Sequence, residues 1–132
     1  VLPLRPEKPI IAADSVVSID GLILGKPKDD EAAKDTLRRL SGRTHEIFTG
    51  VCLLANGKRD VFHRSTQVKF YPLAEEEIAE YVAMGESGGR AGAYGIEGIG
   101  VVLVESICGD YSNIVGLPVA ETIRRLHRLL AR

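Results

Sequence analysis

Two short turn signals set the strongest limit on how this chain can fold. Asp20-Gly21 and Asn56-Gly57 each follow a run rich in β-branched or apolar residues. Such dipeptides favour two-residue hairpin turns, because Asp, Asn and Gly tolerate the positive φ angles that these turns require. We therefore predict two antiparallel hairpins, with strands at residues 9–19 and 22–24 and at residues 44–55 and 61–71.

Three further stretches show the apolar spacing of amphipathic helices, at residues 30–40, 73–84 and from Pro118 onward. Asp29 or Asp30 can cap the first of them. A fifth strand is expected at residues 99–107, because that run is almost wholly apolar. The order of elements predicts an α/β or α+β domain spanning residues 1–132, with a mixed, twisted sheet flanked by helices. In the last helix, the residues expected to pack on the sheet are Val119, Ile123, Leu126 and Leu130.

The composition excludes several classes of protein. The chain is 45% hydrophobic and 27% charged, which is too apolar for a disordered chain, and it has 17 basic against 18 acidic residues. With this balance we expect no bulk attraction to nucleic acid or to a membrane surface. No apolar run approaches the roughly 18 residues of a membrane span. A phosphate-bearing ligand would have to be held by a few placed groups.

The two cysteines and the start of the chain bear on its compartment. Cys52 and Cys108 lie far apart within apolar runs, so we expect both to be reduced and buried. No signal-peptide pattern is present, which makes a cytoplasmic location the expectation. The chain begins at Val1, and residues 1–9 are expected to lead directly into the first strand.

One carboxylate lies where packing alone would not place it. Asp14 lies within or at the end of an apolar strand, after the small residues Ala12 and Ala13. A carboxylate there must be solvated, paired or bound to a metal. It can face a ligand crevice, or it can accept hydrogen bonds in a local turn, and the spacing alone leaves both interpretations open.

Two loops could contact a ligand. In Gly25-Lys26-Pro27 the backbone is restricted on both sides of a lysine that could bind phosphate, although a solvated loop lysine fits equally well. In residues 90–98 the glycines allow backbone amides to approach a ligand, and Tyr94 could contact the ligand or lie in the core. Residues 109–118 contain residue types that favour turns, so we expect a turn there before the last helix. We expect the three histidines, His45, His63 and His127, to be structural or exposed. We expect the arginines of the last helix to form its solvated face; they are Arg124, Arg125, Arg128 and Arg132.

Five motifs in order give the chain a specific resemblance. It resembles the Maf family, also called septum formation proteins, over nearly everything from Ile10 to the last helix. Members of that family are nucleoside triphosphate pyrophosphatases with an α/β fold related to inosine triphosphatases. The motifs are Ala-Asp-Ser-Val-Val (13–17), Ile-Leu-Gly-Lys-Pro (23–27), Leu-Ser-Gly-Arg-Thr-His-Glu-Ile-Phe-Thr-Gly-Val (40–51), Ala-Gly-Ala-Tyr-Gly-Ile-Glu-Gly (91–98) and Gly-Asp-Tyr-Ser-Asn-Ile-Val-Gly-Leu-Pro (109–118).

The resemblance implies an activity and roles for particular residues. It implies hydrolysis of a nucleoside triphosphate to the monophosphate and pyrophosphate with Mg²⁺ or Mn²⁺, and a possible homodimer. Asp14 matches the catalytic aspartate that activates water, and it is also the expected metal ligand. Lys26 matches the phosphate-binding lysine, while Ser15 and Glu97 match specificity positions. Residues 92–96 resemble the branch that acts on dTTP and UTP, whose motif has Gln where this chain has Glu97.

The chain departs from the family pattern at its start. The family's first strand, first helix and Ser-x-Ser-Pro-Arg-Arg loop have no counterpart before Val1. We expect weak or no pyrophosphatase activity if this chain is the whole protein, and an active protein if it is part of a longer one. The alternatives are a catalytically inactive nucleotide-binding or cell-division regulatory module, and an unstable fragment.

Overall fold

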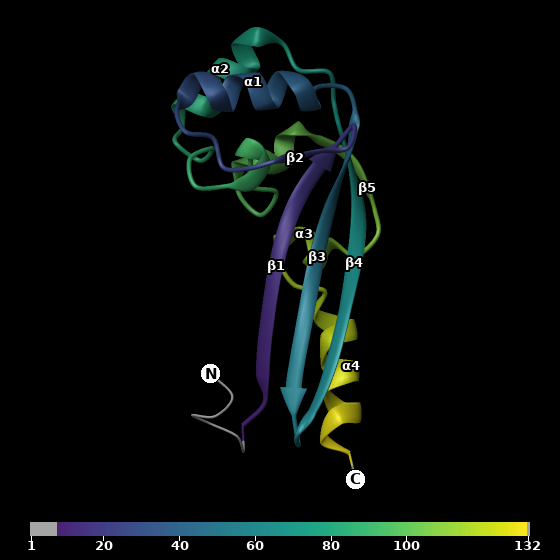
Figure 1. Ribbon diagram of the computed structural model, residues 1–132. Helices are drawn as coiled ribbons and strands as arrows, with labels where there is room; N and C mark the ends of the chain where they lie inside the picture. Colours follow the sequence, from purple (N-terminus) through teal and green to yellow (C-terminus); the bar gives the residue numbers. More distant parts are fainter. Residues whose placement is uncertain (1–7, 132) are drawn as a thin grey trace.

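The computed structural model describes residues 8–131, so the predicted lead-in at residues 1–7 and Arg132 lie outside the described residues. Long strands form the body of the molecule, with helices gathered at one end and a last helix along the other (Figure 1). The elements in order are β1 (Ile10–Ile19), β2 (Leu22–Leu24), α1 (Asp30–Leu40), β3 (Thr44–Ala55), β4 (Lys58–Phe70), α2 (Glu75–Ala83), η2 (Ala91–Ala93), η3 (Ile99–Leu103), β5 (Val104–Cys108), α3 (Tyr111–Val115) and α4 (Val119–Leu130).

Both predicted hairpins are confirmed. Asp20 and Gly21 have φ angles of 53° and 77°, and Asn56 and Gly57 have 53° and 70°. Positive φ at both central residues matches the twist of the flanking strands, which is why these turns join β1 to β2 and β3 to β4.

The five strands lie in the order β2-β1-β3-β4-β5. The α/β class with covering helices is confirmed, but the sheet differs from the predicted mixed one. Every strand pair in residues 8–131 is antiparallel. The reason is visible in Figure 1: the chain leaves β1 and enters β3 at the same end of the sheet, so β3 runs against β1.

One face of the sheet carries the core. Along β3, buried side chains alternate with more exposed ones from His45 to Ala55, as the period of two in a strand requires. The larger cluster joins α1, α2 and the glycine-rich loop to one end of this face. A smaller cluster of Val51, Leu53 and Phe62 packs against residues of the α4 region at the other end.

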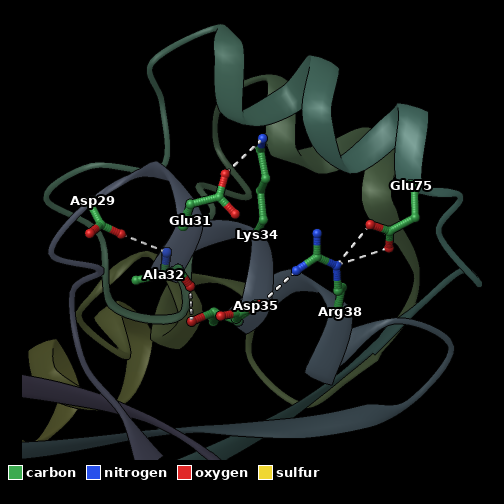
Figure 2. Close-up of polar contacts among 8 residues, drawn as sticks. Asp29, Glu31, Ala32, Lys34, Asp35, Arg38 and Glu75 are labelled. Atoms are coloured by element: carbon green, nitrogen blue, oxygen red, sulfur yellow. Dashed lines mark hydrogen bonds and ion pairs between the residues drawn. The ribbon is translucent and has the colours of Figure 1, made fainter.

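Helix α1 begins and docks through polar contacts (Figure 2). The Asp29 carboxylate accepts a hydrogen bond from the backbone N–H of Ala32 at 2.8 Å, which confirms Asp29 as one of the two predicted caps. Near the other end, the Nε of Arg38 donates to Glu75 of α2 at 2.8 Å. The buried residues Ala33, Leu37 and Leu40 lie on the predicted face.

The strand predicted at residues 99–107 begins only at Val104. Residues 99–103 form a 3₁₀ helix in which Val101 and Val102 are exposed. The backbone N–H groups of Ile99 and Gly100 donate to the Glu86 carboxylate, which turns the chain away from the sheet. Glu86 is distant in sequence, so the apolar run alone predicts a strand.

The packing face predicted for α4 is confirmed at Leu126 and wrong at its three other residues. Val119, Ile123 and Leu130 are 48%, 43% and 42% exposed. Thr122 is buried instead, and Leu126 and Leu129 pack against the smaller core cluster. Arg125 also lies on the side of α4 that faces the sheet.

Arg125 reaches from α4 to strand β4. Its guanidinium lies 4.2 Å from the centre of the Phe62 ring and donates to Asp60 at 2.9 Å. A cation over an aromatic ring and a charge-assisted hydrogen bond both favour turning this side of the helix toward the sheet. The interpretation of Arg125 as part of a solvated face is therefore wrong.

Residues 109–118, interpreted as a turn, contain one turn and one short helix. The Asp110 carboxylate accepts from the N–H of Ser112 at 2.8 Å and caps α3. This helix matters for the site, because Ile114 and Val115 form one wall of a cavity.

Candidate active site

A cavity of about 190 Å³ lies between β1, the glycine-rich loop and α3. Its walls are largely apolar, and its polar side chains are Ser15, Arg90, Tyr94 and Glu97. It therefore collects three of the predicted substrate residues, namely Ser15, Tyr94 and Glu97. Pockets that enclose drug-sized ligands span roughly 300–1,000 Å³, so this one has room for a single ring rather than a whole nucleoside triphosphate. The lining residues are Ser15, Ile47, Arg90, Ala91, Tyr94, Ile96, Glu97, Ile114, Val115 and Gly116.

Ser15 presents hydrogen-bond acceptors to this cavity. Its Oγ lies 2.8 Å from the Oγ1 of Thr49, and the Thr49 hydroxyl donates to the backbone carbonyl of Asn113 at 3.2 Å. Since the single proton of Thr49 is used there, Ser15 is the donor in the first bond. The remaining lone pairs of Ser15 are free to accept from a ligand.

Asn113 holds the α3 wall against the sheet. Its side-chain amide donates to the carbonyls of Ile47 and Arg64, at 3.1 and 3.3 Å, and to the Thr66 hydroxyl at 3.0 Å. Asn113 is fully buried. The sequence motif includes this residue, but its spacing only suggests a turn former, and the cross-sheet contacts are visible only in the fold.

Asp14 does not line the cavity that contains Ser15. It lines an open, mainly apolar hollow of about 270 Å³ on the sheet, beside Ala12 and Gly50. The two side chains lie on opposite faces because consecutive residues of a strand alternate. Asp14 is exposed, and its carboxylate has no hydrogen-bond partner among residues 8–131. Of the two interpretations left open, the local turn is thus excluded.

The free edge of β1 connects the two faces. Strand β2 pairs only with Val17, Ser18 and Ile19. Between Ile10 and Val16, β1 pairs with β3 on one side and has no strand on its other side within the described residues. A ligand that passes over this edge could reach Ser15 on one face and Asp14 on the other.

Lys26 approaches the same region from the loop after β2. In the antiparallel β1–β2 pair, Leu24 lies opposite Val17, so the chain runs on from there in the direction of Asp14. The carbonyl of Gly25 accepts from the N–H of Gly92 at 3.3 Å, which ties this loop to the glycine-rich one. Lys26 itself is exposed and does not line the 190 Å³ cavity.

Gly92 is required for this loop contact. Its φ angle is 76°, and a Cβ on it would lie 3.2 Å from the side chain of Val17. An L side chain would thus be strained in its backbone and crowded against β1. Glycine lets the loop pass close over the strand that carries Asp14 and Ser15.

Tyr94 belongs to the core as much as to the cavity. It is only 6% exposed, and its hydroxyl lies 2.7 Å from the Nε2 of His45. Its ring meets Phe70 edge-on, with centroids 4.8 Å apart. Burial raises the pKa of Tyr94 and lowers the pKa of His45 to about 4. Tyr94 therefore offers the cavity a ring surface, whereas its hydroxyl is already bonded to His45, which has the predicted structural role.

Glu97 forms an ion pair with Arg90 at the cavity. The guanidinium Nη1 of Arg90 donates to the Glu97 carboxylate, and each side chain is 40% exposed. This hydrogen bond is the main reason that the pKa of Arg90 is raised. A Cβ on Gly95 would lie 2.6 Å from the Arg90 guanidinium, so the arginine reaches its partner across the face of a glycine.

Glu86 organises the loop that carries Tyr94 and Glu97. Its carboxylate accepts from the Tyr81 hydroxyl and from the backbone N–H groups of Ile99 and Gly100, at 3.0 and 2.9 Å. Partial burial raises the pKa of Glu86, but these hydrogen bonds outweigh it and the net pKa is lowered. Sequence reasoning missed this residue, because no motif links Glu86 to a loop 13 residues away.

The described residues fit a metal held mainly by a substrate. Residues 8–131 contain no group of three or more His, Cys, Asp or Glu side chains placed to share a metal ion. Mg²⁺ is commonly bound through one or two carboxylates, several waters and substrate phosphates rather than in a protein cage. The exposed carboxylate of Asp14 meets that requirement with one ligand.

No helix among residues 8–131 is both long and apolar enough to cross a bilayer. Both cysteines are free, with Cys52 half-buried and Cys108 exposed rather than buried as expected. Cys108 lies on β5, where residues 105–108 are all exposed.

Known proteins similar to this chain agree with the sequence motifs. A family model described as "Maf-like protein" matches residues 2–129. A dTTP/UTP pyrophosphatase of Nitratidesulfovibrio vulgaris is 51% identical over 120 residues, which cover 90% of this chain and 57% of the relative. Proteins with the same name from Bacillus cytotoxicus and Bacillus pumilus are 48% and 45% identical, over 96% and 93% of this chain and 66% and 65% of their own lengths. The chain thus spans about two thirds or less of these relatives.

Proposed function

This chain belongs to the family of Maf-like proteins, and on that basis we propose that it hydrolyses dTTP/UTP-type nucleoside triphosphates to the monophosphate and pyrophosphate. The names of its relatives supply the substrate class. The observation that carries the proposal is the junction at β1. There, a ring-sized cavity lined by Ser15 and Glu97 adjoins the strand residue Asp14, across an edge that no other described strand covers.

The nucleotide lies across this edge. Its base occupies the cavity against the ring of Tyr94 and the apolar side chains of Ile96 and Ile114, with polar contacts from Ser15 and Glu97. The triphosphate leaves the cavity past the free edge of β1. Lys26, on the loop that is tied to Gly92, supplies a positive charge for the phosphates.

Asp14 acts as the general base. Its exposed carboxylate accepts a proton from water as the water oxygen bonds to the α-phosphorus. The bond from that phosphorus to the bridging oxygen breaks, and pyrophosphate leaves with the electron pair. Charge on the leaving group is stabilised by Lys26. Asp14 is the residue that would hold a Mg²⁺ or Mn²⁺ ion, which would supply further charge neutralisation when bound.

The setting of the reaction follows from its substrate. We propose a cytoplasmic location, where nucleoside triphosphates are held, and the two free cysteines are consistent with a reducing compartment. We propose neither nucleic acid nor membrane as a partner. A homodimer stays a prediction carried over from the family.

A second candidate function is nucleotide binding without turnover, as in a regulatory module. One observation favours it: among residues 8–131, Asp14 is the only acidic residue that lines its hollow. If the described residues lack enough charge to stabilise the reaction, the base cavity can still bind the nucleotide.

Pyrophosphate release from dTTP and UTP tests the proposal. We expect Mg²⁺- or Mn²⁺-dependent release by the wild type, and a loss of about 10²- to 10⁴-fold in kcat for Asp14→Ala and Asp14→Asn, the range typical of a general base. Asp30→Asn, at an exposed carboxylate on α1, is the matched control and should keep full activity. Release that survives Asp14→Ala would remove the role of Asp14. Binding without release by the wild type would favour the second candidate.

A further inference from the structure

The Glu97 side chain lacks the hydrogen-bond donor that recognition of a uracil or thymine base requires. A carboxylate only accepts hydrogen bonds, whereas the edge of uracil or thymine presents both the N3–H donor and the O4 acceptor. A lone carboxylate would bind N3–H and repel O4. Some group in the cavity has to donate to O4, and Ser15 has already used its proton on Thr49.

Among the described residues that line the cavity, Arg90 is the one whose side chain carries N–H donors. It lines the same cavity as Glu97, and its Nη1 donates to one carboxylate oxygen. A guanidinium has five N–H groups and a carboxylate has two oxygens, so the pair has both donors and an acceptor left over. Side by side, Arg90 and Glu97 present together what a single carboxamide presents alone.

We propose that Arg90 is a specificity-determining residue that reads the base jointly with Glu97, with Arg90 donating to O4 of a uracil or thymine and Glu97 accepting from N3–H. The inference rests on the proposed function for the choice of base. It goes beyond it by assigning the donor to a second side chain.

The geometry of the loop supports a functional role for the Arg90–Glu97 ion pair. Arg90 passes directly over Gly95, where a Cβ would lie 2.6 Å from the guanidinium, so a side chain at this position would require Arg90 to shift. The Glu86 carboxylate binds the backbone of the same loop at Ile99 and Gly100. Glu97 therefore lies on a loop whose backbone is held a few residues further on, and its carboxylate is paired with Arg90 before any base binds.

Substrate analogues separate a donor role from mere charge neutralisation. In 4-thio-UTP the oxygen at position 4 is replaced by sulfur, a weaker acceptor, while N3–H is kept. We expect the wild type to prefer UTP over 4-thio-UTP about tenfold in kcat/KM, and Arg90→Met to reduce this ratio to about one. Arg90→Lys, which keeps a charge and a donor but loses the planar fork, should give an intermediate ratio.

A double-mutant cycle tests the joint role. Arg90→Met should lower kcat/KM for UTP at least tenfold, because the Glu97 carboxylate then faces O4 unaided. In the Glu97→Gln background the same change should cost less than about threefold, because the carboxamide supplies both groups. Arg59→Met, at an exposed arginine on β4 outside the cavity, is the matched control and should match the wild type.

Equilibrium binding keeps this inference separate from the proposed hydrolysis. The dissociation constant of α,β-imido-UTP, which resists cleavage between these phosphates, is measured for the same variants and compared with that of α,β-imido-CTP. Base-dependent weakening by Arg90→Met without any pyrophosphate release would support the inference and reject the hydrolase. If the protein hydrolyses UTP, but Arg90→Met changes neither the ratio of kcat/KM between UTP and 4-thio-UTP nor the ratio of dissociation constants between the UTP and CTP analogues, the inference is overturned and the proposed hydrolysis stands. If neither nucleotide binds, both fail.

Discussion

Asp14 and Ser15 are consecutive residues of β1, and their side chains line two different hollows on opposite faces of the sheet. A substrate that uses both must therefore cross the strand rather than lie in one pocket. The segment that it crosses has no strand beyond it in the described part of the chain. Under the proposed function, this arrangement separates recognition of the base from chemistry at the phosphates, and we predict that the two can be altered separately.

Ser15→Ala tests that separation. Loss of the hydroxyl removes acceptors that Ser15 can offer to a sugar hydroxyl of the nucleotide, since Glu97 takes the base N3–H, and it leaves Asp14 untouched. We therefore expect KM for dTTP and UTP to rise up to about tenfold, the effect of one hydrogen bond. The value of kcat should stay within about threefold of wild type. Steady-state pyrophosphate release measures both. Ser18→Ala, in the same strand and outside the cavity, serves as the control, and a fall in kcat alone for Ser15→Ala would contradict the separation.

Glu86 should act on the site only through the loop. Glu86→Gln replaces one accepting oxygen by an NH₂ group that only donates, so the side chain can no longer accept from Tyr81, Ile99 and Gly100 together. We expect it to lower the free energy of unfolding by about 1–3 kcal/mol and to raise KM more than it lowers kcat. Urea unfolding and steady-state kinetics measure the two effects. The exposed Glu80→Gln on α2 is the matched control, and equal behaviour of both variants would remove the role of Glu86.

His45 makes stability depend on pH. Burial lowers its pKa to about 4 in the folded chain, against 6.5 for an unperturbed histidine. Between these values the unfolded chain binds a proton that the folded chain does not, so stability falls as the pH drops from 6.5 to about 4. The total loss is about 3 kcal/mol.

His45→Gln isolates this effect from the titration of carboxylates. Glutamine can still bond to the Tyr94 hydroxyl, but it does not titrate. Urea unfolding at pH 7 and pH 4 should show that the wild type loses about 3 kcal/mol more than the variant between the two. Parallel losses in the two proteins would mean that His45 is protonated without cost in the folded state.

Two alanine substitutions test which face of α4 packs against the sheet. Leu126 packs against the smaller core cluster, whereas Ile123 is 43% exposed. We expect Leu126→Ala to cost about 2 kcal/mol of stability and Ile123→Ala less than about 0.5 kcal/mol. Chemical denaturation of both variants gives the comparison. A larger loss of stability for Ile123→Ala than for Leu126→Ala would mean that α4 packs through the face that the apolar spacing predicts.

Elements governed by near neighbours could be predicted from the sequence. The turns at Asp20-Gly21 and Asn56-Gly57 and the cap at Asp29 depend on the φ preferences and hydrogen bonds of a few adjacent residues. The motifs likewise identified the family and the candidates Asp14, Ser15, Lys26, Tyr94 and Glu97. The same local rules failed at residues 99–103 and at α4, where Glu86 and Arg125 impose contacts from far along the chain.

Whether a feature could be predicted depends on whether it rests on neighbouring residues or on contacts between distant parts of the chain. The sequence by itself determined the two hairpins with their strands, the candidate residues and the chemistry available to each, since these depend on residue type and local backbone preference. Only the tertiary structure decided that the cavity lies on the face of Ser15 and not of Asp14, that the Tyr94 hydroxyl is bonded to His45, and that Arg90 meets Glu97 across Gly95. Those relationships depend on how the sheet and its loops pack together, because packing places side chains next to partners that their position in the chain does not specify.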